Sequence, residues 1–327
     1  MNSLGERVRV GESTARIWRV GLGGAPIGGM YAPVPEAEAF ATVRKAMDLG
    51  LRHIDTAPYY GMGRSEEVVG AALKGLKRGD YTLSTKVGRV LVPEGGAVGE
   101  EWAESRGLRA VFDFSEEGVR KSVEGSRGRL GVRDFDILFI HDCDGREAEA
   151  LGHTYPVLER MREHGEVRAV GAGLNSYETA LKLARAERFD CFLVAGRYTL
   201  LEQGALDEFF PYCKDKKIGV VLGGVFNSGI LASGASPGSR YNYSSAPREI
   251  LAKTGKVKEV CDRFGVSLRS AALQFVLANP DVTSIVVGCR SSSEVEENAA
   301  ALQQEVPRGL WEGLKAERLL REDAPTP

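Results

Sequence analysis

The chain has 327 residues, of which 43% are hydrophobic and 27% are charged, a composition that can bury one large core. Its formal net charge is −2, with Lys and Arg mixed among Asp and Glu, which argues against a nucleic acid or a membrane surface as partner. No apolar run approaches the roughly 20 residues that cross a bilayer, and residues 1–7 lack the apolar segment of a secretion signal. The five cysteines are scattered and never spaced as Cys-x-x-Cys, so we expect reduced thiols in a cytoplasmic protein.

Strand-like and helix-like segments alternate along the chain. Residues 8–10 and 15–17, on either side of a short turn, predict a hairpin ahead of the first alternating unit. The predicted strands that follow cover residues 19–23, 51–55, 81–86, 135–141, 167–173, 191–195, 218–222 and 282–287. The predicted helices cover residues 35–49 and 65–76, a segment beginning at Ser115, a segment with Leu158 and Met161, and residues 177–187, 206–216 and 292–302. Ser65 is expected to cap the second helix.

Near-continuous Val, Ile and Leu strands alternating with amphipathic helices indicate a parallel sheet covered by helices. Eight such units favour a closed (β/α)8 TIM barrel, formed by one domain over residues 1–327, over an open doubly wound sheet. The usual Gly-x-Gly-x-x-Gly of the open sheet is only loosely imitated by residues 21–24. We expect the N-terminal hairpin to plug one end of the barrel. A C-terminal helix with the stripe Leu310, Trp311 and Leu314 is expected to cover its side.

Two long insertions interrupt the alternation, after the third and the seventh predicted strands. Residues 90–114 are rich in Gly and Glu, and residues 226–247 are rich in Gly, Ser and Tyr. Loops of this length in a compact domain usually shape a site. Both leave the C-terminal mouth of the barrel, where barrel active sites lie, so we expect the functional site there.

Four polar residues end or follow predicted strands at this mouth. Asp55 ends the second strand, Tyr60 follows it in a turn held by Pro and Gly, Lys86 ends the third strand and His141 the fourth. Taken singly, each has an ordinary structural interpretation: a turn cap, a packing tyrosine, a snorkelling lysine or a buried core histidine. Taken together at successive strand ends, they indicate proton-transfer chemistry.

The run from His141 to Asp144 also raises the question of a metal site. Alternation along a strand would place His141 and Cys143 on one side and Asp142 and Asp144 on the other. A metal-dependent barrel hydrolase should offer several histidines at strand ends, whereas this chain has four histidines in all. We therefore expect no catalytic metal.

The order Asp55, Tyr60, Lys86, His141 resembles the catalytic tetrad of the aldo-keto reductases, and the resemblance covers nearly the whole chain. It implies that Tyr60 is the acid/base and that Lys86 lowers the pKa of this phenol from its ordinary value of about 10. It further implies that Asp55 holds Lys86 and that His141 orients the substrate oxygen. Tyr59 is the alternative phenol, but the family pattern favours the tyrosine directly before the glycine.

The same resemblance implies that an NAD(P) cofactor lies across the mouth. Residues 218–231 are similar to the family's seventh strand and diphosphate loop, and residues 287–298 to its adenosine-binding segment. An ordinary helix start with serine caps is the structural alternative for the second segment. The candidate cofactor-binding residues are Gly24, Ala25, Asn175, Gly223, Gly224, Phe226, Asn227, Gly229, Leu231, Gly288, Arg290, Ser291, Glu294, Glu297 and Asn298.

Some of these positions depart from the family pattern. Gly223 stands where an aromatic residue often stacks on nicotinamide, so Phe226 is the candidate substitute, and Ala195 stands where many members carry Gln. Glu294 would repel a 2′-phosphate and accept a hydrogen bond from a free hydroxyl, which favours NAD over NADP. Arg290 argues in the opposite direction.

Residues 195–203 and 223–231 look like the sugar-oxidising branch of the family, with pyridoxal dehydrogenases close by. This resemblance implies oxidation of an aldose at C1 to a lactone. A general aldehyde or ketone reductase is the alternative, and a nicotinamide-binding sensor without turnover is an alternative of another class. The substrate would be a small carbonyl compound or sugar, and the oligomeric state is left open. Substrate contacts are expected from Tyr31, Trp102, Asp142, Arg197 and Tyr241.

Overall fold

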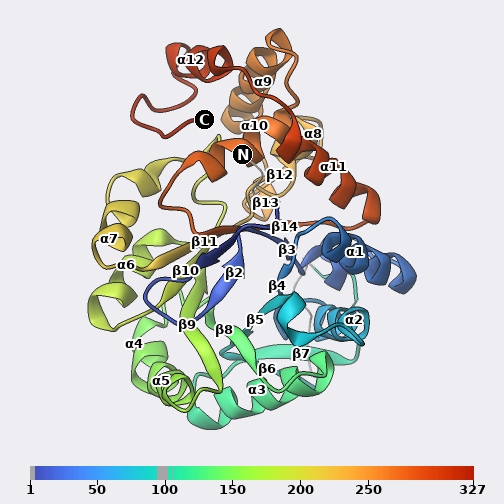
Figure 1. The fold of residues 1–327 in the computed structure, drawn as a ribbon, viewed down its shortest axis with the longest axis vertical. Helices are drawn as coiled ribbons and strands as arrows, with labels where there is room; N and C mark the ends of the chain where they lie inside the picture. Colours follow the sequence, from blue (N-terminus) through green and yellow to red (C-terminus); the bar gives the residue numbers. More distant parts are fainter. Residues whose placement is uncertain (1–3, 94–101, 105) are drawn as a thin grey trace.

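Eight parallel strands form a closed barrel inside a ring of helices (Figure 1). The structure is a computed structural model that describes residues 4–93, 102–104 and 106–327. Around the barrel the strands follow one another in chain order, and the last pairs with the first. The predicted (β/α)8 barrel is confirmed. Its strands are β3 (Val20–Gly23), β4 (His53–Asp55), β5 (Thr82–Val87), β8 (Phe135–His141), β9 (Val167–Leu174), β10 (Cys191–Ala195), β11 (Gly219–Gly223) and β14 (Ser284–Gly288).

The helices of the ring follow the strands largely as predicted. They are α1 (Glu36–Asp48), α2 (Arg64–Leu73), α3 (Glu116–Leu130), α5 (Tyr155–Glu163), α6 (Tyr177–Ala186), α7 (Phe209–Asp215), α10 (Leu268–Ala278) and α11 (Ser292–Gln303). Ser115 caps α3 by accepting a hydrogen bond from the Gly118 N–H, as its position predicted. The short helices α4 (Glu147–Glu149) and α8 (Ile230–Ser233) lie in connections.

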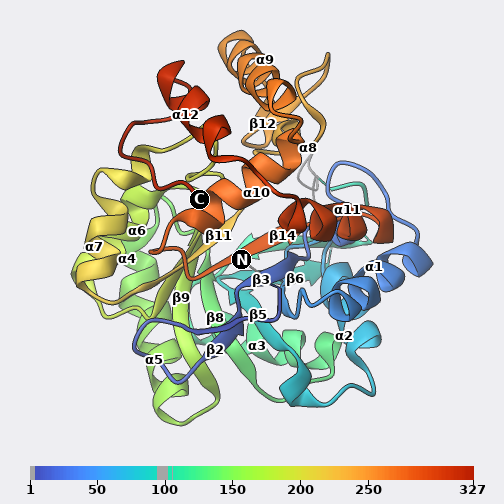
Figure 2. The same ribbon diagram turned by 45° about the horizontal axis from the view of Figure 1, so that its top comes forward.

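Two further helices stand at the top of Figures 1 and 2, outside the barrel: α9 (Arg248–Arg263) and α12 (Arg308–Ala316). Neither α9 nor α10 was predicted from the sequence. The apolar stripe of α12 is buried, and the Trp311 ring packs against Phe275 of α10 with ring centres 6.4 Å apart. The C-terminal stripe therefore packs against helices of its own chain.

Alternation along the strands separates an apolar core inside the barrel from one beneath the helices. Ile137 and Phe139 of β8 belong to the interior cluster, whereas Leu138 and Ile140 pack with the helical layer. This alternation follows from the two-residue period of a strand. It determines which polar side chains at the strand ends can point into the barrel.

The N-terminal hairpin closes one end of the barrel. Its strands β1 (Arg7–Arg9) and β2 (Arg16–Trp18) pair antiparallel, and Figure 1 shows β2 across the centre of the barrel. Val10, Ala15 and Ile17 are fully buried and belong to the interior cluster. The hairpin is therefore the plug that the sequence predicted, and the opposite end of the barrel is the open mouth.

Both long insertions contain hairpins that the sequence pattern did not predict. In the first, β6 (Arg89–Pro93) pairs antiparallel with β7 (Leu108–Phe112). Part of the predicted 90–114 loop, residues 94–101 and 105, lies outside the described residues. In the second, β12 (Arg240–Tyr241) pairs antiparallel with β13 (Ser244–Ser245). The insertions are therefore partly ordered by backbone pairing.

Helix α2 begins differently from the prediction. Gly63, with φ 86°, occupies the N-cap position, and Ser65 lies inside the helix. The Ser65 hydroxyl donates to the Gly24 carbonyl and contacts Thr56 Oγ1, each at 2.8 Å. The prediction that Ser65 caps the helix is therefore wrong, because its hydroxyl joins the ends of β3 and β4 instead of the helical N–H groups.

Glu66 of α2 joins three elements beneath the mouth. Its side chain is fully buried. Thr85 of β5 donates to its Oε1 at 2.6 Å, and the Arg129 Nε of α3 donates to its Oε2 at 2.7 Å. A buried carboxylate needs such partners because an isolated charge is costly away from water. Since Thr85 directly precedes Lys86, the Glu66 contacts fix β5 next to the candidate lysine.

Replacing Arg129 with Met is expected to lower the free energy of unfolding by about 3–5 kcal/mol, because it leaves the Glu66 charge buried without its cation. The double variant Arg129→Met/Glu66→Gln should recover part of the loss. Urea unfolding followed by circular dichroism measures both. The matched control is Arg120→Met on the same helix, whose ion pair with Glu116 is exposed and should contribute less than about 1 kcal/mol. Equal losses in Arg129→Met and Arg120→Met would contradict the assignment.

Candidate active site

Three of the four candidate residues are aimed into the barrel by strand alternation. Asp55, Lys86 and His141 end or nearly end β4, β5 and β8, which are neighbours in the barrel. His141 lies two and four positions after the interior residues Phe139 and Ile137, so its side chain points to the same side of β8. A Cβ built on Gly173 of β9 would lie 3.4 Å from Lys86 Cε, which places the lysine stem inside the barrel. All three side chains are buried.

Lys86 and Asp55 form a buried ion pair at the base of the mouth. Lys86 Nζ donates to Asp55 Oδ2 at 2.7 Å and to the Thr56 carbonyl at 2.8 Å. Ser84 donates to the other carboxylate oxygen, Oδ1, at 2.7 Å. Each charge therefore has a second hydrogen bond besides the ion pair, which buried ions require. The network fixes the position of the ammonium.

Tyr60 lies over this ammonium. Lys86 Nζ is 4.6 Å from the centre of the Tyr60 ring, and the His141 ring is 5.8 Å from it at 82°. The turn is held by Gly61, which has φ 60°. A Cβ on Gly61 would lie 2.0 Å from the Gly28 carbonyl oxygen, so only glycine fits there. The structure thus brings Asp55, Tyr60, Lys86 and His141 together.

Tyr59 shares the rings of Trp102 and His141 with Tyr60 but lies against a different cation. The Arg89 guanidinium lies 4.1 Å from the centre of its ring, and the Trp102 ring packs edge-on at 5.2 Å. Between the two neighbouring tyrosines, the ammonium of Lys86 therefore lies against Tyr60. This favours Tyr60 over Tyr59 as the functional phenol.

Burial raises the pKa of the Tyr60 phenol well above its ordinary value, the carboxylates of Asp55 and Asp142 raise it further, and Arg89 opposes them. The expectation of a pKa below the ordinary value is therefore wrong for the protein without bound ligands. Burial dominates, and Asp55 neutralises the ammonium at 2.7 Å. Burial also lowers the pKa of His141 well below its ordinary value, with Lys86 and Arg89 adding to the shift. At neutral pH the site therefore presents a neutral phenol and a neutral imidazole.

Asp142 follows His141 in a left-handed conformation, φ 48°. Arg89 Nη2 donates to its Oδ2 at 2.9 Å, and Asn175 Nδ2 donates to its Oδ1 at 3.0 Å. Its Oδ2 is also 3.4 Å from His141 Nε2. The expected separation of His141 and Asp142 on opposite strand faces is wrong because β8 ends at His141 and the backbone then changes direction. Burial raises the pKa of Asp142, while Arg89 lowers it.

The structure gives each of the other candidate substrate residues a defined contact. Trp102 packs against both Tyr59 and Tyr60. The guanidinium carbon of Arg240 lies 4.5 Å from the centre of the Tyr31 ring. The Arg197 Nε donates a hydrogen bond to the Asn175 carbonyl. The Tyr241 hydroxyl donates to Glu202, and its phenol lies within electrostatic range of Arg197. Tyr243, two residues later, was not a candidate, yet its phenol lies within electrostatic range of Tyr60 and Asp142.

The candidate cofactor residues lie on neighbouring strand ends. β14, β3 and β4 are adjacent, and Gly288, Gly23 and Asp55 are paired in register across them. A Cβ on Gly288 would lie 2.8 Å from Pro26 Cγ, and one on Gly24 would lie 2.5 Å from Ser65 Oγ. Ala25 leads into the turn η1 (Pro26–Gly28). Gly288, Gly23 and Gly24 thus form a strip of backbone without side chains that leads to Asp55 and its ion pair with Lys86.

The loop after β11 supplies the next group. Gly224 has φ 58°, and a Cβ there would lie 2.9 Å from the Gly196 nitrogen. Asn227, with φ 44°, donates from Nδ2 to the Gly196 carbonyl at 3.2 Å, and its buried Oδ1 has no partner within the described part of the chain. Phe226 and Leu231 are buried in the outer core, and Gly229 precedes α8 with φ 98°. Gly223 ends β11 on an inward position.

The start of α11 forms the far end of the candidate cofactor site. Ser291 caps the helix by accepting from the Glu294 N–H. Glu294 binds the Arg290 guanidinium at 3.0 Å and also accepts from the Arg290 backbone N–H at 2.8 Å. Farther along the helix, Glu297 and Asn298 both contact Arg269, at 2.9 Å and 2.6 Å. Asn298 is buried and also donates to Cys289.

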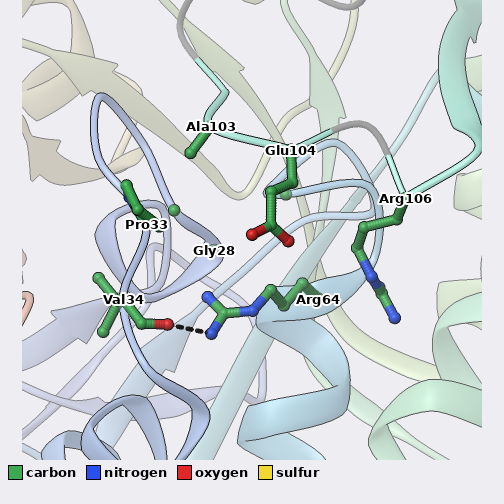
Figure 3. A pocket seen from close by; sticks show the side chains of 9 residues that line it. Gly28, Pro33, Val34, Arg64, Ala103, Glu104 and Arg106 are labelled. Carbon is green, nitrogen blue, oxygen red and sulfur yellow. Dashed lines mark hydrogen bonds between the residues drawn. The ribbon is translucent and has the colours of Figure 1, made fainter.

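A separate small cavity lies on the outer side of the Tyr60 turn. Figure 3 shows Arg64 between Val34 and Glu104, with its guanidinium donating to the Val34 carbonyl. The cavity measures about 20 Å³ and is lined by Gly61 but by none of the four candidate residues. It is distinct from the candidate active site. Within the described ranges, no three His, Cys, Asp or Glu side chains gather as a metal ion would require, and no helix is long and apolar enough to span a bilayer.

Known proteins match this chain over nearly its full length. Pyridoxal 4-dehydrogenase from Microbacterium luteolum is 34% identical over 96% of this chain and 98% of that protein. D-threo-aldose 1-dehydrogenase from a Pseudomonas species is 37% identical over 94% of this chain and 95% of that protein. A holo aldo-keto reductase from Bacillus halodurans shares the fold with a TM-score of 0.78 at 23% identity, over 97% and 96% of the two chains.

The model of the Aldo/keto reductase family matches residues 19–312, which include all eight barrel strands and the four residues at their ends. This match agrees with the barrel fold. The chain therefore belongs to the aldo/keto reductase family of NAD(P)-dependent oxidoreductases.

Proposed function

We propose that this enzyme oxidises a cyclic hemiacetal, in the first place an aldose at C1, to the corresponding lactone with NAD. The observation that carries the proposal is the Tyr60 phenol between the Lys86 ammonium and the His141 imidazole, at the end of a side-chain-free strip. The two dehydrogenases named above, one of an aldose and one of pyridoxal, support the substrate class. Pyridoxal also closes to an internal hemiacetal, so it is the second candidate substrate.

Small residues at several strand ends would let a nicotinamide approach the phenol. Five strands, β3, β9, β10, β11 and β14, carry none of the four candidate residues. At or near the end of each, a small residue occupies a position whose side chain would point into the barrel. A bound nicotinamide accepts the hydride in oxidation and supplies it in reduction. The buried Asn227 Oδ1, which has no partner among the described residues, offers an acceptor nearby. The small inward residues are Gly23, Gly173, Ala195, Gly223 and Gly288.

In the proposed reaction Tyr60 takes the proton of the C1 hydroxyl as the C1–H hydride leaves. Lys86, 4.6 Å from the ring centre, stabilises the phenolate that must form first, and Asp55 holds Lys86 in place. His141, neutral because burial lowers its pKa, can hydrogen-bond the substrate oxygen without adding a charge. Asp142, held by Arg89 and Asn175, is placed to accept a hydrogen bond from a neighbouring sugar hydroxyl.

The Arg290–Glu294 pair supports a preference for NAD. Glu294 occupies the guanidinium of Arg290 and the backbone N–H of the same residue. A 2′-phosphate would have to displace this carboxylate and would meet its negative charge. A free 2′-hydroxyl can donate to the carboxylate instead.

A substrate panel tests the proposal directly. We expect absorbance of reduced nicotinamide to appear when the protein is incubated with NAD and an aldose or pyridoxal, and a lactone product that hydroxylamine traps. Simple aldehydes with NADH are the comparison. Robust reduction of simple aldehydes without oxidation of any sugar or of pyridoxal would favour the general reductase and contradict the proposal.

Tyr60→Phe should reduce turnover about 10²- to 10⁴-fold, the range for loss of a general acid–base group, with little change in nicotinamide binding. Because the pKa of Tyr60 is raised, the wild-type oxidation rate should increase with pH as the phenol loses its proton, whereas reduction should not. Lys86→Met should move this increase to higher pH. The exposed Lys182→Met is the control. Equal low turnover in wild type and Tyr60→Phe would favour the sensor.

Glu294→Gln should shift the ratio of kcat/KM for NAD over NADP toward NADP by about tenfold, because it removes a charge and loosens Arg290. Arg290→Ala in the same background should reverse the shift. Both ratios come from initial rates with the best substrate of the panel. Glu296→Gln, whose partner is Lys45, is a matched control on the same helix. An unchanged ratio in Glu294→Gln would rule out this basis for cofactor choice.

A further inference from the structure

The hairpin β12–β13 carries a tyrosine in an unfavourable backbone conformation. Its two turn residues, Asn242 and Tyr243, have φ 46° and 70°, the pattern of a type I′ turn. Asn suits the first position, but the second strongly favours Gly, and a bulky side chain there costs roughly 1 kcal/mol or more. Tyr243 is therefore kept at a position where a smaller residue would be more stable.

The hairpin is attached on both sides of the mouth. On one side, Asn242 Oδ1 accepts from Asn227 Nδ2 at 3.0 Å, and the Tyr243 N–H donates to Ser228 Oγ at 2.9 Å. On the other side, the Arg240 guanidinium lies 4.5 Å from the centre of the Tyr31 ring. Asn227 and Ser228 follow β11, whereas Tyr31 follows β3. The hairpin thus connects the loops of two strand ends and holds its turn near the opening.

The Tyr243 phenol faces the residues of the active site. The residue as a whole is 43% exposed, yet burial raises the pKa of its hydroxyl, and the ionised forms of Tyr60, Asp142 and Tyr31 raise it further, while Arg197 lowers it. Although part of the residue is in solvent, its hydroxyl lies within electrostatic range of the group around Tyr60.

We propose that Tyr243 is a substrate-contacting residue that determines specificity: its hydroxyl binds a hydroxyl of the sugar ring, and its ring covers the substrate from the side opposite the barrel floor. This inference rests on the proposed function, because the partner it requires is a ring with several hydroxyl groups. Asp142 and Arg197 would contact the same substrate from the strand ends. Aromatic faces suit the C–H faces of a sugar, and a phenol adds one hydrogen bond.

The backbone conformation provides a test that separates contact from structure. Tyr243→Gly removes the side chain but suits φ 70°, so its melting temperature should equal or exceed that of wild type. The same variant should raise KM for the preferred aldose about tenfold or more, and Tyr243→Phe about fivefold, the loss of one hydrogen bond. Ser245→Ala, in the same hairpin and exposed, is the matched control and should leave KM unchanged.

Binding of NAD, measured by calorimetry, separates a contact between Tyr243 and the substrate from a contact between Tyr243 and the cofactor. An unchanged Kd for NAD together with the increased KM supports the inference. An increased Kd for NAD with unchanged KM would overturn it, and so would unchanged values of both. If wild type converts no aldose, the proposed substrate fails. Tyr243→Gly is then compared with wild type on whichever carbonyl compound or hemiacetal of the panel is converted, and an unchanged KM there overturns the inference by itself.

Discussion

The ion pair of Lys86 and Asp55 is the interaction on which the rest of the site depends. Two opposite charges at 2.7 Å inside the barrel are tolerated only because Ser84 and the Thr56 carbonyl complete their hydrogen bonds. That arrangement requires β4 and β5 to be in register, with Asp55 opposite Ser84. It also requires Thr85 to face outward, where Glu66 binds it. The position of the ammonium beneath Tyr60 is thus determined by packing on both faces of one strand.

The order of strands around the barrel divides the mouth into two halves. β4, β5 and β8 carry the proton-transfer residues, whereas β11, β14 and β3 carry the glycine-rich loops. The two halves meet where Gly23 of β3 pairs with Asp55 of β4. This junction consists of backbone pairing and one buried ion pair, so its geometry does not depend on the substrate loops.

Much of this arrangement was predictable from the sequence, because it rests on local patterns. β8 and β10 begin and end where the apolar runs do, and the four polar residues stand at strand ends that a parallel barrel must bring to one edge. The helices α9 and α10 were missed because their apolar periodicity follows directly on the long polar loop after β11. The predictions of a cap at Ser65 and of strand alternation beyond His141 were wrong for the same reason. Each assumed that a regular element continued past the point where tertiary contacts changed the backbone.

The expectation of a lowered pKa for Tyr60 failed for a different reason. The sign of a pKa shift depends on burial and on which charge is already neutralised, and neither is visible in the order of residues. Tyr243 was not a candidate because its side-chain direction depends on the left-handed turn at Asn242 and Tyr243, which the residue pattern does not reveal. Non-glycine residues with positive φ recur around the mouth. Strain of this kind is common where function constrains the backbone.

The plug formed by Val10, Ala15 and Ile17 has a consequence for how molecules pass through the barrel. Because apolar packing closes the floor of the barrel, coenzyme and substrate must both enter and leave through the mouth. Whichever molecule occupies the deeper position must come in ahead of the other and go out after it.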